Sequence, residues 1–127
     1  MQLDPHDTQA REFLEMNKAV RGNNKYAIAY YRKALQPNPS NPYAHYLLGE
    51  VLAKDSQSDE GVRELQEALK MKPDIAAAHN GIGIILASKG NLSETIGHFR
   101  EALKIKPNFR KASDKLRVAL AQQKTIR

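Results

Sequence analysis

The chain has 127 residues, of which 41% are hydrophobic and 27% are charged, and its formal net charge is +6. This composition is typical of a folded globular protein, and the length suits one domain. The absence of cysteine excludes disulfide bonds, thiolate metal sites and a cysteine nucleophile. No apolar run approaches the ~20 residues that a transmembrane helix needs, and the first residues lack the apolar core of a signal peptide. We therefore expect a cytoplasmic protein.

A period of 34 residues runs along the chain. Pro39, Pro73 and Pro107 are spaced 34 residues apart, and an Ala-Leu pair precedes each proline at the same distance. A recurring period of this length indicates stacked repeats. Aligned on these prolines, the single predicted domain, 1–127, divides into the end of a preceding repeat (1–7), three repeats (8–41, 42–75 and 76–109) and a closing helix (110–127).

The sequence predicts two helices in each of the first two repeats. A helix is predicted over 8–21, and Gly22-Asn23 forms the turn to its partner helix. In the second repeat Asn41 and Pro42 favour a helix start, because asparagine caps a helix and proline suits its first position. The apolar residues that follow recur at helical spacing, first over 42–54 and then up to Pro73: Ala44, Leu48, Val51, Leu52, Val62, Leu65, Ala68 and Leu69.

The third repeat and the closing helix continue this pattern. A helix over 76–88 is predicted from Ile82, Ile85 and Leu86, and Gly90-Asn91 forms the turn to the next helix. Five apolar residues of 110–127 predict a final helix with a polar outer face: Ala112, Leu116, Val118, Ala119 and Leu120. No segment has the alternating pattern of a strand, so the predicted fold class is all-α.

These residues resemble the tetratricopeptide repeat, a helix–turn–helix unit with a period of 34. The family's Leu-Gly pair matches Leu48-Gly49 and Ile82-Gly83. Its first small position matches Ala27, Gly61 and Thr95. Its large apolar position matches Tyr31, Leu65 and Phe99, and its second small position matches Ala34, Ala68 and Ala102. The resemblance implies a right-handed α-solenoid of three such units plus a C-terminal solvating helix, about seven helices in all. The first unit departs from the pattern, with Leu14-Glu15 at the Leu-Gly position. Leu3-Asp4-Pro5 looks like the end of an earlier repeat, so we expect a piece of a longer array.

No constellation of catalytic residues is present in the sequence. His45 and His79 occupy the same repeat position, too far apart to share a metal ion, and a packing role is the favoured interpretation. Gly81-Ile82-Gly83 lies inside a predicted helix and follows no strand, which excludes a phosphate-binding loop. We therefore predict no enzymatic activity, no cofactor, no metal and no small-molecule substrate.

The resemblance also implies where a partner binds. First helices of the family line a concave groove that binds peptides, and the second apolar stripe on these helices is typical of an interaction surface. Tyr43 and Tyr46 are the best anchor candidates, although some of these side chains could simply pack against neighbouring helices. An apolar or amphipathic segment is the expected partner. The groove positions and edges are Phe13, Met16, Val20, Tyr43, Tyr46, Leu47, Glu50, Lys54, Asn80, Ile84, Lys111 and Lys115.

More specific binding modes of the family do not match. Members that clamp two carboxylates use lysine, arginine and asparagine at positions that hold Glu12, Met16, Leu47, Ala77 and Gly81 here. Self-association and binding of single-stranded RNA remain alternatives, and the apolar groove disfavours RNA binding.

The positive charge is concentrated at the C-terminal end. From Lys104 onward the chain holds eight basic residues and one acidic residue, whereas residues 1–103 hold 12 basic and 13 acidic ones. We interpret this basic end as a solvated face rather than as a site for an acidic partner or a membrane surface.

Overall fold

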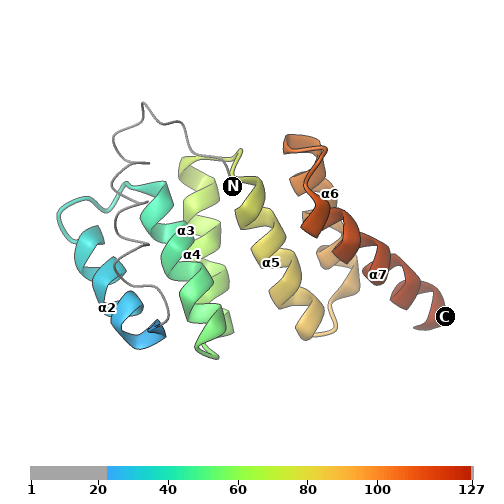
Figure 1. Ribbon diagram of the computed structural model, residues 1–127, viewed down its shortest axis with the longest axis horizontal. Coiled ribbons are helices and arrows are strands. Elements are labelled where there is room, and N and C mark those ends of the chain that lie inside the picture. Colours follow the sequence, from blue (N-terminus) through green and yellow to red (C-terminus); the bar gives the residue numbers. More distant parts are fainter. Residues whose placement is uncertain (1–22, 127) are drawn as a thin grey trace. The chain divides into compact units, whose positions relative to one another are not determined.

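The computed structural model describes residues 23–126, which form six helices and no strand (Figure 1). The helices are α2 (Asn24–Leu35), α3 (Pro42–Lys54), α4 (Ser58–Met71), α5 (Ala76–Ser88), α6 (Leu92–Ile105) and α7 (Arg110–Ile126). The all-α prediction is confirmed, and the bounds expected for 42–54 and 76–88 are those of α3 and α5. The helix predicted over 8–21 and the segment 1–7 lie outside the described residues.

The helices divide into two compact units. Unit 1 ends at Pro73 and contains α2, α3 and α4, and unit 2 begins at Asp74 and contains α5, α6 and α7. Within unit 1, α3 packs against both α2 and α4, while in unit 2 α6 packs against both α5 and α7. Within residues 23–126, no helix combines the length and the apolarity that crossing a membrane requires.

Asparagine side chains cap the N-termini of two helices. The Asn23 side-chain oxygen accepts a hydrogen bond from the Tyr26 backbone N–H at 3.0 Å, which caps α2. Asn41 does the same for α3 through the Tyr43 N–H at 3.1 Å, and Pro42 follows at the first helical position. Each cap satisfies a backbone donor that has no partner inside the helix. The predicted start of α3 is therefore confirmed.

The turns inside the second and third repeats have the same geometry but different residues. Gln57 N–H donates to the Leu52 carbonyl at 2.8 Å, and Asn91 N–H donates to the Leu86 carbonyl at 3.0 Å. The residue before each donor has a positive φ, 66° at Ser56 and 78° at Gly90. Glycine adopts this left-handed conformation readily, whereas a side chain makes it costly. The turn of the second repeat is therefore strained at Ser56, whereas the turn of the third repeat has glycine at the same position.

Ser56→Gly is expected to raise the free energy of unfolding by about 0.5 kcal/mol, because relief of the left-handed strain outweighs the extra freedom of glycine in the unfolded chain. Urea denaturation of the full chain measures the change. Ser113→Gly is the matched control, since Ser113 lies inside α7, where glycine destabilises a helix. A loss of stability in Ser56→Gly would contradict this interpretation of the turn.

Each unit has an apolar core between its helices. In unit 1, residues of α2 including Ile28 and Tyr31 pack with Leu48 and Leu52 of α3. In unit 2, Ile96 and Phe99 of α6 pack with Ala119 of α7, flanked by Leu116 and Leu120. Val118 was also expected on the inner face of the closing helix, but its side chain is 57% exposed. That expectation is wrong, because one helical step of about 100° turns Val118 away from the face that carries Ala119.

Small residues allow close helix contacts inside both units. A Cβ atom on Gly61 of α4 would lie 2.9 Å from the Gly49 carbonyl oxygen of α3, and a Cβ on Gly49 would lie 2.9 Å from the Gly61 carbonyl oxygen. In unit 2, a Cβ on Gly83 of α5 would lie 2.6 Å from the Phe99 ring. All three distances are shorter than normal van der Waals contact. These glycines therefore set how closely the paired helices approach.

Candidate peptide-binding faces

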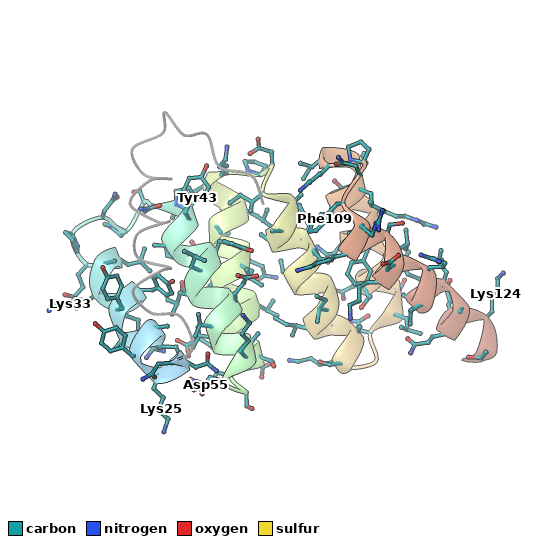
Figure 2. The ribbon with its side chains drawn as sticks, in the orientation of Figure 1. Lys25, Lys33, Tyr43, Asp55, Phe109 and Lys124 are labelled. Carbon is teal, nitrogen blue, oxygen red and sulfur yellow. The ribbon has the colours of Figure 1, made fainter. Side chains whose placement is uncertain are left out.

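The predicted groove positions of α3 are more buried than an open binding surface requires. Tyr43, at the N-terminal end of α3 (Figure 2), is 5% exposed, and Tyr46 is 6% exposed. Leu47 is partly buried, because it packs against the core residues of α2 and α3 and against Tyr43 and Ala44; Glu50 is also partly buried. Lys54, near the end of the helix, is exposed. In this structure neither tyrosine ring is an open anchor, and a binding role for them stays a prediction.

Tyr46 and Glu50 interact with each other one helical turn apart. Burial raises the pKa of the Tyr46 phenol far above its usual value, and the Glu50 charge and a hydrogen bond to that carboxylate raise it further. Burial also raises the pKa of Tyr31 to about 12, with smaller contributions from Glu50 and Tyr30. Both phenols are therefore held in their neutral forms. On α3, the Tyr46 hydroxyl thus has a hydrogen-bond partner in Glu50 of the same helix.

These two tyrosines predict a loss of stability at alkaline pH. Their folded-state pKa values lie above the value of 10.0 for an unperturbed phenol, so above pH 10 the unfolded chain loses protons that the folded chain keeps. The contribution is complete below pH 10 and is lost as the pH rises toward the folded-state values, by about 1 kcal/mol per pH unit for each tyrosine. Urea denaturation between pH 9.5 and 11.5 measures this slope. Tyr46→Phe should flatten it, and an unchanged slope in both Tyr46→Phe and Tyr31→Phe would contradict the assignment.

The equivalent face of α5 differs from that of α3. Asn80 and Ile84 occupy the repeat positions of Tyr46 and Glu50 and lie one turn apart on the same helix side. Asn80 is 8% exposed, and its side-chain oxygen has no hydrogen-bond partner in the described structure. Ile84 is 41% exposed. No Asp, Glu, Lys or Arg occurs in α5, so this face is apolar with one unsatisfied acceptor.

The remaining predicted residues fall into two groups. Lys111 and Lys115 are exposed on α7, in unit 2. Phe13, Met16 and Val20 lie outside the described residues. The structure therefore places one set of predicted residues on α3 in unit 1, and another on α5 and α7 in unit 2.

Two side-chain pairs were missed by reasoning from the sequence. His45 Nδ1 lies 2.7 Å from Glu64 Oε1, and its Nε2 lies 2.9 Å from the Pro39 carbonyl oxygen. One repeat later, His79 Nδ1 lies 3.1 Å from His98 Nδ1. Each pair joins the two helices of one repeat across a spacing of 19 residues, so the shared spacing was a signal present in the sequence.

The His79–His98 pair lies beside two carboxylates. Both rings are half-buried, and they border a shallow cavity of about 340 Å³ that is also lined by Glu94, Gly97 and Glu101. Burial lowers the pKa of His98, while the charges of Glu94 and Glu101 act in the opposite direction. The net lowering favours a neutral imidazole with a lone pair on one ring nitrogen.

A larger open cavity lies on α2. It has a volume of about 540 Å³ and is lined by Tyr26, Ala29, Tyr30, Lys33 and Ala34. Among the described residues, its lining side chains come from α2 and are mainly aliphatic and aromatic. The sequence had not singled out this surface.

Comparison with solved structures gives matches over most of the chain. The first TPR of Spaghetti (RPAP3), bound to the HSP90 peptide SRMEEVD, has a TM-score of 0.82 at 18% identity, covering 91% of this chain and 92% of that one. MamA protein has a TM-score of 0.80 at 22% identity, covering 89% and 63%. An O-GlcNAc transferase mutant from Thermobaculum terrenum has a TM-score of 0.80 at 22% identity, covering 94% and 23%. The chain thus spans less than two thirds of the latter two proteins, and the likeness concerns the fold.

Comparison with protein families gives the same result from sequence alone. No curated protein sequence matches the chain. Two family models do: one described as TPR repeat matches residues 20–56, and one described as tetratricopeptide repeat matches residues 52–108. Both describe the repeat that the 34-residue period had indicated. The chain belongs to the tetratricopeptide repeat family.

Proposed function

We propose that the chain is a non-catalytic scaffold that binds a segment of a partner protein through the first helices of its repeats. The exposure of Ile84 carries this proposal. This large apolar side chain is 41% exposed on α5, a helix whose neighbouring isoleucines, Ile82 and Ile85, are buried. Ile84 lies at a position that lines the peptide-binding groove in the family, and its apolar side chain could contact an apolar residue of a bound helix.

The chemistry of α5 indicates which kind of segment binds. The helix has no Asp, Glu, Lys or Arg, so it offers no charge to an acidic or basic peptide. The exposed side chain of Ile84 therefore fits a segment that presents an apolar residue, as one face of an amphipathic helix does.

A structural relative supports peptide binding but not the same peptide. The RPAP3 domain is bound to SRMEEVD, a segment with two glutamates and a terminal aspartate. The positions that the family uses to clamp carboxylates hold Leu47, Ala77 and Gly81 in the described part of this chain, and none of these is basic. We therefore expect the SRMEEVD peptide not to bind, which makes it a negative control.

Selection from a phage-displayed library of random 16-residue peptides tests the proposal. Enriched peptides should carry apolar residues at helical spacing, and Ile84→Asp should weaken the binding of a selected synthetic peptide at least tenfold. Val118→Asp is the matched control, because it makes the same change at an exposed position of α7 in the same unit. Circular dichroism checks that both variants fold.

The results also separate the alternatives. Equal weakening by Val118→Asp, or binding of SRMEEVD, would contradict the proposed site. A mass that rises with protein concentration in light scattering, and falls in Ile84→Asp, would favour self-association through this face. Binding to single-stranded RNA that weakens steeply with salt, and that needs Lys111 and Lys115, would favour the nucleic-acid alternative.

A further inference from the structure

We propose that His79 and His98 together bind a divalent transition-metal ion, with Glu94 or Glu101 supplying a carboxylate oxygen. The site lies within unit 2, between α5 and α6, and does not depend on the proposed partner binding. Imidazole nitrogen suits Zn²⁺, Ni²⁺ and Cu²⁺, and carboxylate oxygen often completes such sites.

The spacing of the two ring nitrogens suits a shared metal ion. His79 Nδ1 and His98 Nδ1 are 3.1 Å apart, and the ring planes are inclined by 34°. Two Zn–N bonds of about 2.0–2.1 Å that enclose an angle of 90–110° separate the nitrogens by about 2.9–3.4 Å. The observed distance lies within this range. A metal ion would therefore replace the hydrogen bond between the rings with little movement of either helix.

Two carboxylates are within reach of the pair. Glu94 precedes His98 by four residues and Glu101 follows it by three, which places all three on one side of α6. The described residues contain no ready-made group of three metal ligands, so a carboxylate must rotate to complete the site. Present partners hold the two side chains weakly: Glu94 accepts from the Asn91 amide at 3.0 Å, and Glu101 lies 3.5 Å from Lys104 Nζ. Both contacts are exposed and cost little to break.

The surroundings leave room for an ion and its water ligands. The two histidines and two glutamates line the same open cavity of about 340 Å³. Gly97, between the carboxylates, has no atom within 4 Å of the place where a Cβ would lie.

The second repeat shows the same position without the nitrogen pair. There Glu64 replaces the second histidine, and His45 is bonded to Glu64 on one side and to the Pro39 carbonyl on the other. The flanking glutamates recur as Glu60 and Glu67, but Glu60 is 2.6 Å from Arg32. His45 therefore provides an internal control for a histidine in the same helical setting.

Titration of the full chain with ZnCl₂ against a chromophoric chelator tests the proposal. One Zn²⁺ should bind per chain, and His79→Gln and His98→Gln should each weaken binding at least tenfold. His45→Gln should leave it unchanged. The double variant Glu94→Gln/Glu101→Gln alters only exposed side chains and should also weaken binding; an unchanged affinity there would overturn the carboxylate assignment.

A second measurement avoids substitutions altogether. In the ¹⁵N-histidine-labelled wild-type chain, ZnCl₂ should shift the Nδ1 resonances of His79 and His98 and leave those of His45 in place. Zinc binding that leaves both Nδ1 resonances unshifted, or no binding at a tenfold excess of ZnCl₂, would overturn the site.

Discussion

Gly61→Ala is expected to lower the free energy of unfolding by about 3 kcal/mol, at the upper end of the cost of overpacking a core. The new Cβ would lie 2.9 Å from the Gly49 carbonyl oxygen and 3.2 Å from the Ala53 backbone nitrogen. Both atoms belong to the α3 backbone, which cannot rotate away as a side chain can. The helices α3 and α4 must separate, and separation opens the packing around Leu52 and Leu65, which are both buried.

The matched control for this change is Gly97→Ala. Gly97 also lies inside a helix, but a Cβ there would meet no atom within 4 Å. Alanine is the better helix former by about 1 kcal/mol, so this variant should be slightly more stable than the wild type. Urea denaturation measures both variants. If both substitutions changed the free energy of unfolding equally, α3 and α4 would be packed less closely at Gly61 than in this structure.

Phe99→Ala is expected to lower the free energy of unfolding by about 3–5 kcal/mol, because it removes a large side chain from a packed core. Phe99 is 1% exposed and packs with Ile96 and Ala119. It also faces Gly83 across the α5–α6 contact. The ring thus joins the packing of all three helices of unit 2.

A double-mutant cycle with Gly83→Ala tests this contact specifically. In the wild-type background the Gly83 Cβ would lie 2.6 Å from the Phe99 ring, so Gly83→Ala should cost about 2 kcal/mol. In Phe99→Ala the space is open, and most of that cost should vanish, which gives an interaction energy of at least ~1 kcal/mol. If the two changes in unfolding free energy measured by urea denaturation were additive, Gly83 and Phe99 would not be energetically coupled.

Local signals in the sequence predicted the helices well. Asn41 and Pro42 marked the start of α3, and the Leu48-Gly49 pair with Gly61 marked the place where two helices meet closely. These features act within one turn or recur with the repeat period. One sequence is therefore enough to recognise them.

Burial across helices was harder to predict. Tyr43 and Tyr46 stood out as surplus apolar residues, but the structure buries both rings. Val118 matched the apolar pattern of the closing helix and yet faces solvent. The side of a helix that a neighbour covers depends on how helices pack, and the apolar pattern of one helix does not specify it.

The histidine pair shows a missed signal of a different kind. The sequence pattern related His45 to His79, because both occupy the same repeat position. The informative comparison was between the two helices of one repeat, where a spacing of 19 residues joins His45 to Glu64 and His79 to His98. Antiparallel pairing within the repeat, once assumed, makes that spacing a contact.

Binding of a partner segment at the α5 face is tested most directly by methyl NMR. A chain labelled at the isoleucine δ1 methyl groups would be titrated with a peptide selected from the random library. The methyl group of exposed Ile84 should shift most, while that of Ile28, buried in the core of unit 1, should shift little. A peptide that binds and leaves the Ile84 methyl resonance unmoved would contradict the account.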